Sequence, residues 1–230
     1  MRMALEFAKT GPARYISHLD LQRAFSRAIR RSGLPVKLSE GFNPHYVVSF
    51  ASALAVGMES VAECVEMVLS QDVALDEFLL RIAKVLPPGL EARRAVRLPQ
   101  NAPKLMAALR FAEYTVEVNG DREAISRAVQ SMLAETQVMV DKTAKGVTKR
   151  VDIRGMIGDI SWRDDKLVLR LASAQEGTLR PELVMDELCH RAGRFSWRAV
   201  RTALLADGPD GPMDLLDRCR NVNDTGRKPR

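Results

Sequence analysis

The sequence SHLDLQRAFSRAIRRSGLP, residues 17–35, decides how the first part of the chain folds. Ser17, followed three residues later by Asp20, fits a capping box at a helix start. Gly33 can take the left-handed conformation that closes a helix, and Pro35 prevents its continuation. Apolar residues recur at helical spacing, with arginines mainly on the opposite side. The stretch therefore predicts an amphipathic helix with a basic outer face.

The segments around this helix alternate between strand and helix patterns. Strands are expected within residues 3–16, 36–39, 47–53, 62–69 and 90–98, and a second helix over residues 75–85. This order of strand, helix, strands, helix and strand is typical of the split βαβ, ferredoxin-like arrangement. We therefore expect a ferredoxin-like domain over residues 1–99 that carries the candidate site.

The same order starts again after a proline-containing boundary at residues 98–103. Strands are expected over residues 110–118, 137–140, 147–153, 166–172 and 195–205, and helices over residues 122–134 and 182–191. FSRAI at residues 25–29 is echoed by ISRAV at residues 125–129, each in the first helix of its block. The sequence thus predicts an α+β fold of two tandem ferredoxin-like domains, 1–99 and 108–206, and a flexible tail over 207–230.

Composition and charge indicate a globular protein with an anionic partner. The 230 residues are 46% hydrophobic and 28% charged, with a formal net charge of +6. That charge favours nucleic acid as a partner, although a basic surface without any ligand is an equally simple explanation. Three widely spaced cysteines, no signal-peptide pattern and no apolar run of membrane-spanning length predict a cytoplasmic protein without a membrane partner.

The stretch SEGFNPHYVVSF, residues 39–50, suggests a small polar pocket. A turn with glycine, an aromatic residue, Asn-Pro and histidine follows the basic helix, whose N-terminus carries unpaired N–H groups that can bind an anion. The alternative is a hairpin connection with a packed phenylalanine and an exposed histidine. The candidate pocket residues are Tyr15, Ser17, His18, Asp20, Ser39, Gly41, Phe42, Asn43, Pro44 and His45.

Two basic surfaces are candidates for binding nucleic acid or another anion. The first is the arginine face of the helix, because guanidinium groups bind phosphates in a bidentate manner. The second is a glycine-containing hairpin over residues 141–154, which has no interleaved aromatic residues to stack on bases. A solvated surface is the alternative in both cases. The candidate residues are Arg23, Arg27, Arg30, Lys142, Lys145, Lys149, Arg150 and Arg154.

Common enzyme motifs are missing from the sequence. There is no phosphate-binding P-loop, no dinucleotide-binding glycine pattern, no zinc-protease motif and no hydrolase nucleophile elbow. The three histidines and three scattered cysteines do not have the spacing that is typical of a zinc site. We therefore expect no metal site and no cofactor.

An ordered set of motifs resembles the radical SAM-linked protein family, a domain of unknown function. The motifs are residues 14–20, 27–35, 39–45, 49–50 and 54–57, followed by Ser60 and Glu63. The resemblance implies a radical SAM protein encoded separately as the partner, because this chain lacks the C-x-x-x-C-x-x-C motif that holds an iron–sulfur cluster. It also implies that the candidate pocket residues, together with Arg27 and Arg30, belong to the family's motifs.

Three functions are compatible with these features. The first is a non-catalytic module that binds RNA or another anionic substrate and presents it to the radical SAM partner. The second is a protein–protein adaptor for that partner without RNA binding. The third, by fold analogy with CRISPR repeat-RNA processing enzymes, is a metal-independent RNA endonuclease that uses His18 or His45 as general acid or base.

Overall fold

The structure, a computed structural model, describes residues 1–144 and 146–221, which form two compact units. The first unit contains Met1–Arg110 and the chain from Arg201 onward, and the second is Phe111–Val200. Strand β11, Ser196–Gly208, has residues in both units. Each unit combines antiparallel strands with helices, so the fold is α+β. No helix in the described ranges is long and apolar enough to cross a membrane.

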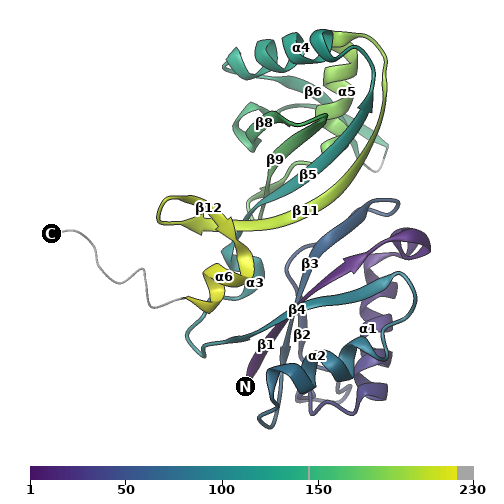
Figure 1. Ribbon diagram of the computed structural model, residues 1–230, viewed down its shortest axis with the longest axis vertical. Helices are drawn as coiled ribbons and strands as arrows, with labels where there is room; N and C mark the ends of the chain where they lie inside the picture. Colours follow the sequence, from purple (N-terminus) through teal and green to yellow (C-terminus); the bar gives the residue numbers. More distant parts are fainter. Residues whose placement is uncertain (145, 222–230) are drawn as a thin grey trace, which may run out of the picture. The chain divides into compact units, whose positions relative to one another are not determined.

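The first unit contains an antiparallel sheet in which β1 lies between β3 and β4, and β2 pairs with the other edge of β3. Figure 1 shows helices α1 and α2 beside these strands. The bounds are β1 Arg2–Lys9, α1 His18–Ser32, β2 Val48–Phe50, β3 Glu59–Val68, α2 Leu75–Ala83, β4 Leu90–Leu98 and α3 Leu105–Ala108. A short 3₁₀ helix, Gly11–Tyr15, connects β1 to α1.

One face of this sheet packs against α1 and α2 to form a hydrophobic core. Phe7 of β1 contacts Phe25 of α1, with ring centroids 4.8 Å apart, and Phe50 of β2 meets Phe25 edge-on at 5.3 Å. Leu5 and Val65, which are paired in register, are fully buried in the same cluster. Period-two alternation in β1 and β3 therefore directs large apolar side chains toward the helices.

The side chains that alternate with these apolar residues point to the opposite face of the sheet, where charged groups form ion pairs. The Arg94 guanidinium of β4 binds Glu6 of β1 at 3.3 Å, Asp214 at 2.7 Å and Asp217 at 3.0 Å. The two aspartates belong to the chain beyond residue 207, so this network attaches the C-terminal segment to the sheet.

Residues 207–221, which we expected to be part of a flexible tail, form regular structure. Strand β12, Gly211–Asp214, pairs with β11, and helix α6, Leu215–Arg220, follows. The Asp214 carboxylate accepts hydrogen bonds from the first backbone N–H groups of α6, and the apolar side chains of this helix are fully buried. A six-residue helix is stable here because it packs against the protein, and no local pattern encodes that packing. Residues 222–230 lie outside the described residues.

The second unit has strands in the order β10–β9–β5, with β8 on β9, and helices α4 and α5 packed together. Strand β8 was not among the predicted strands. It forms a hairpin with β9 around Asp164, whose φ is +57°. The bounds are β5 Leu109–Asn119, α4 Arg122–Ala134, β6 Met139–Ala144, β7 Val147–Asp152, β8 Ile157–Arg163, β9 Lys166–Ala174, β10 Gly177–Thr178 and α5 Pro181–Ala192.

Candidate anion-binding groove on helix α1

Helix α1 begins and ends as the sequence predicts. The Ser17 hydroxyl accepts a hydrogen bond from the Asp20 backbone N–H at 3.2 Å and donates one to the Asp20 carboxylate at 2.7 Å. Gly33 closes the helix with a φ of +62°. The Arg23 guanidinium lies 3.0 Å from the Asp20 carboxylate. Hydrogen bonds from the Ser17 hydroxyl and from this guanidinium both lower the pKa of Asp20. The capping group therefore also holds the first arginine of the basic face.

The three predicted arginines lie on one face of α1 and line a groove of about 300 Å³. Ser26 of the same helix and Tyr46 complete its lining. Within the described ranges, the exposed side chains of Arg27 and Arg30 make no hydrogen bond or ion pair. The groove therefore presents two guanidinium groups that no carboxylate of residues 1–144 and 146–221 neutralises.

Tyr46 is a site residue that our sequence analysis missed. A bridge between Leu38 and Tyr46, and a hydrogen bond from the Val47 N–H to the Lys37 carbonyl, fold the chain back beside α1. Tyr46 is half-buried and packs against the core cluster. The only available signal was its place directly after the predicted turn, and proximity to α1 depends on tertiary packing.

The predicted turn is present as a closed loop, Ser39 to His45. The Ser39 N–H donates to the His45 carbonyl at 2.7 Å, and the Ser39 hydroxyl accepts from the His45 N–H at 3.1 Å. The same hydroxyl lies 2.9 Å from His45 Nδ1. Gly41 has a φ of +119°, which only glycine adopts without strain. Phe42 is fully exposed, so it is not the packed phenylalanine of the alternative interpretation.

The two histidines of the predicted pocket have separate neighbours. His18 Nε2 lies 3.1 Å from Gln22 Nε2, and its ring meets Phe50 edge-on at 5.4 Å. His45 bonds within its own loop, and in the described part of the chain no contact joins the two imidazoles. Tyr15 is exposed, with the Arg14 guanidinium 4.7 Å above its ring.

Buried charges, which no sequence pattern indicated, position the segment that leads into α1. Lys9 Nζ donates to the carbonyl oxygens of Arg14, at 3.3 Å, and Ile16, at 3.1 Å. Burial lowers the pKa of Lys9, and the nearby Glu63 carboxylate opposes this effect. Arg201, also buried, donates to Glu63 at 2.9 Å. These residues read as ordinary members of strands, and only pairing between distant strands brings them together.

The predicted basic hairpin is the two-stranded ribbon of β6 and β7. Lys142 lies directly opposite Lys149, and Thr143 is opposite Thr148, with their hydroxyls 2.8 Å apart. Both lysines are exposed. Lys145 lies outside the described residues. The ribbon thus places two like charges side by side, which disfavours the pair unless an anion lies near them.

The other two basic candidates of this region have different surroundings. The Arg154 guanidinium donates to the backbone carbonyls of Leu133, at 2.9 Å, and Ile157, at 3.4 Å. It therefore stabilises the chain around it and is poorly available to a ligand. Arg150 is opposite Asp141 in the ribbon.

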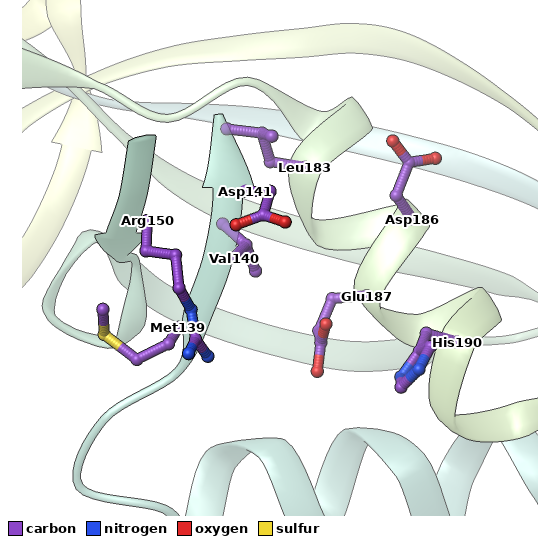
Figure 2. Close-up of a pocket in the computed structure, with 8 residues that line it drawn as sticks. All are labelled: Met139, Val140, Asp141, Arg150, Leu183, Asp186, Glu187 and His190. Carbon is purple, nitrogen blue, oxygen red and sulfur yellow. The ribbon is translucent and has the colours of Figure 1, made fainter. Parts of the chain in front are cut away.

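Arg150 also lines a cavity of about 530 Å³ between the ribbon and α5, shown in Figure 2. Three carboxylates from the two elements share this lining with Arg150 and His190. One of them, Glu187, binds Arg191 at 2.6 Å. The described residues contain no group of three or more histidine, cysteine, aspartate or glutamate side chains arranged to hold a metal ion. This mixed lining suits an anion less well than the α1 groove. The lining residues are Met139, Val140, Asp141, Arg150, Leu183, Asp186, Glu187 and His190.

Comparison with known proteins places the sequence in a bacterial family. The pattern of the family described as "Uncharacterized protein conserved in bacteria (DUF2344)" matches residues 2–181. The chain belongs to this family. The matched region includes helix α1, the loop after it and the ribbon of the second unit.

Other comparisons add little. No curated protein matches the chain. One solved structure, the crystal structure of an unknown protein from Galdieria sulphuraria, is similar over 87% of this chain and 97% of that chain, with 14% identity and a TM-score of 0.27. A similarity at this level supports no argument about fold or function.

Proposed function

We propose that this protein binds RNA through the α1 groove and acts as an accessory module of a separately encoded radical SAM enzyme. The observation that carries the proposal is the row of Arg23, Arg27 and Arg30 beside Tyr46. Among the residues that the structure describes, none supplies a counter-charge to Arg27 or Arg30. A guanidinium group binds phosphate oxygens through paired hydrogen bonds.

The spacing of the arginines suits a phosphate chain. Arg23 and Arg30 are two helical turns apart, which corresponds to about 10 Å along the axis. This row is longer than one phosphate group, so its three guanidinium groups can each bind a different phosphate of one strand. A single small anion would use only part of this length, which favours a polymeric ligand.

The radical SAM partner and the tandem domain arrangement belong to the same proposal. The partner rests on the resemblance of the motifs around Arg27 and Gly41 to the radical SAM-linked family. The strand order β4–β1–β3–β2 in the first unit is the order of a split βαβ domain, and β11–β5–β9–β8 repeats it with the second unit's elements. Both orders support the proposal of two tandem ferredoxin-like domains.

The test is the salt dependence of RNA binding. Fluorescence anisotropy with a labelled RNA should give a slope of log K against log salt near −2, if about three phosphates are contacted at about −0.7 each. The double variant Arg27→Ala/Arg30→Ala should bring that slope about 1.4 closer to zero. Arg127→Ala is the matched control, because Arg127 has the place of Arg27 in the ISRAV echo and is exposed on α4. A slope near zero, or one that the double variant leaves unchanged, would contradict the proposal.

A protein–protein adaptor is the second candidate, and an apolar surface favours it. Tyr15, Leu19 and Val56 are exposed around the start of α1, where the Gly57 N–H donates to the Arg14 carbonyl at 2.8 Å. In this case Leu19→Ser should weaken capture of the purified radical SAM partner while RNA binding stays absent at every salt concentration.

The endonuclease hypothesis requires that metal-free protein cleaves RNA and that this cleavage depends on a histidine. Cleavage should therefore be assayed in His18→Ala and in His45→Ala, and its loss in either variant would identify the histidine.

A further inference from the structure

The loop from Ser39 to His45 carries an exposed aromatic ring, Phe42, four residues before Tyr46 of the groove. Phe42 is fully exposed at its tip, although phenylalanine is among the residues most often buried. The loop is closed by hydrogen bonds between Ser39 and His45, so the ring is presented on an ordered turn. A fully exposed phenylalanine on such a turn contributes nothing to the core and is available to a ligand.

Pairing next to the loop connects it to the groove. The loop begins immediately after Leu38, which bridges to Tyr46, and Tyr46 lines the groove with the arginines. Directly opposite residues in an antiparallel pair project to the same face, so the exposed Leu38 side chain extends the surface next to Tyr46. Leu38 and Tyr46 thus connect the groove on α1 to the two ends of the loop that carries Phe42.

Basic and aromatic side chains together select one kind of occupant. Guanidinium groups bind the phosphate backbone, whereas an exposed aromatic ring stacks on a base that is not already stacked on neighbouring bases. Bases in a duplex are stacked on each other, and sequence-reading proteins bind RNA mainly where bases are unpaired. A purely apolar protein partner would leave the arginine charges of the groove without a counterpart.

We propose that Phe42 stacks on an unpaired base of the RNA strand whose phosphates lie in the α1 groove. The ligand is then single-stranded RNA, a loop, a bulge or an end, and duplex RNA is a poor substitute. This inference rests on the proposed function and specifies its substrate class.

The experiment compares a single-stranded RNA carrying 2-aminopurine with the same strand annealed to its complement. Stacking on Phe42 should quench the fluorescence of the bound single strand, and Phe42→Ala should abolish the quench and lower affinity about 5- to 150-fold. Phe42→Trp should restore both. The salt slope should be the same in Phe42→Ala and in the unaltered protein, because the change removes no charge, whereas Arg27→Ala/Arg30→Ala should reduce it.

Each contrary outcome has a separate meaning. Salt-dependent RNA binding that is equal for single strand and duplex and insensitive to Phe42→Ala would overturn the stacking inference and leave the proposed function intact. Failure of the unaltered protein to bind either RNA would refute the proposed function and the inference with it. Loss of capture of the radical SAM partner in Phe42→Ala, with RNA binding unchanged, would assign the loop to protein docking and overturn the inference. Thermal unfolding of each variant confirms that the fold is retained.

Discussion

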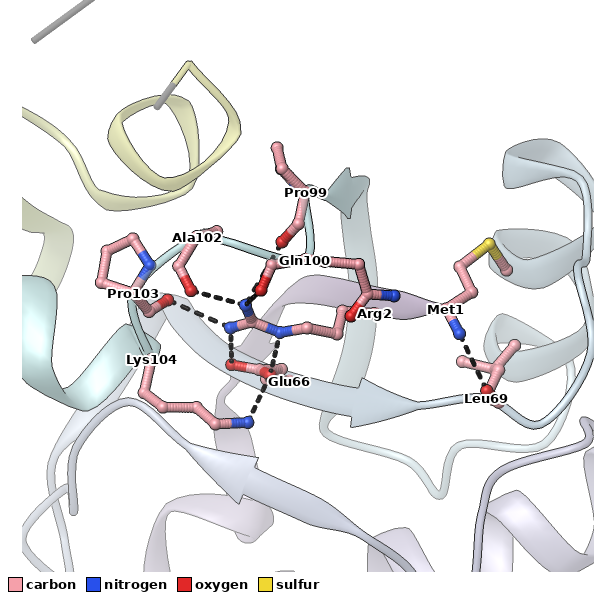
Figure 3. A network of polar contacts seen from close by, with 9 residues as sticks. All are labelled: Met1, Arg2, Glu66, Leu69, Pro99, Gln100, Ala102, Pro103 and Lys104. Atoms are coloured by element: carbon pink, nitrogen blue, oxygen red, sulfur yellow. Dashed lines mark hydrogen bonds and ion pairs between the residues drawn. The ribbon is translucent and has the colours of Figure 1, made fainter. Parts of the chain in front are cut away.

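Replacement of Arg2 by alanine should lower the free energy of unfolding by about 3–5 kcal/mol, the range for breaking a buried ion pair. Figure 3 shows the polar network that contains Arg2. Arg2 is 7% exposed, and its guanidinium donates to the Glu66 carboxylate at 2.8 and 3.1 Å. It also donates to backbone carbonyls of the segment that follows β4. Those carbonyls belong to Pro99, Gln100, Ala102 and Pro103.

The magnitude follows from what the change leaves behind. Glu66 is 2% exposed and, among the described residues, would keep Lys104 alone, at 3.0 Å, as a charged partner. Arg2→Lys should cost less than Arg2→Ala, because an ammonium group keeps the charge but does not reach several carbonyls in a planar fork. Lys104→Ala is the matched control: its side chain is 60% exposed, so its loss should cost no more than about 1 kcal/mol.

The same network predicts how stability depends on pH. Burial raises the pKa of Glu66, but hydrogen bonds from Arg2 and Lys104 outweigh burial and leave the pKa below its usual value. A folded-state pKa below that of the unfolded chain gives stability that is fully present above about pH 4.5 and is lost as the pH falls through the folded-state pKa. The difference in the free energy of unfolding between the unaltered protein and Arg2→Ala should therefore become smaller below about pH 4.5.

Urea unfolding followed by circular dichroism at pH 7 and at several values below pH 4.5 measures both effects. A loss smaller than about 1 kcal/mol for Arg2→Ala at pH 7, or a difference that stays constant as the pH falls, would refute the reasoning.

Three further changes test other features of the structure. Gly89→Ala should destabilise the protein by about 2 kcal/mol or more, because φ is +84° and the new Cβ would lie 2.7 Å from the Thr10 carbonyl oxygen; chemical denaturation measures this, and a cost below about 0.5 kcal/mol would contradict it. Burial raises the pKa of Cys219 to about 11 and also raises the pKa of Cys64, so both thiols should resist alkylation in native protein and react in urea, as mass spectrometry would show. Phe42→Ala should change the free energy of unfolding by less than about 0.5 kcal/mol, since the ring is fully exposed; a larger loss in denaturation would mean that the ring packs against the protein.

Helix α1 shows how much local sequence determines. Ser17, Asp20 and Gly33 specify the helix ends through contacts within a few residues, and the 3.6-residue period separates the apolar face from the arginines. The basic face was therefore predictable, and the structure has it as the lining of a groove. The β6–β7 ribbon was also predictable from a short stretch of sequence, because a glycine-containing turn joins two short strands.

The remaining features depend on contacts between residues far apart in the chain. Tyr46 reaches the groove because the chain folds back at Leu38, and Arg201 meets Glu63 across 138 residues. Helix α6 was missed because six residues form a stable helix only where a partner surface buries them. Local patterns thus determined the helix, its charge and the turn that follows it. Tertiary structure alone decided which side chains share a site, because burial and strand pairing join segments whose proximity no short stretch encodes.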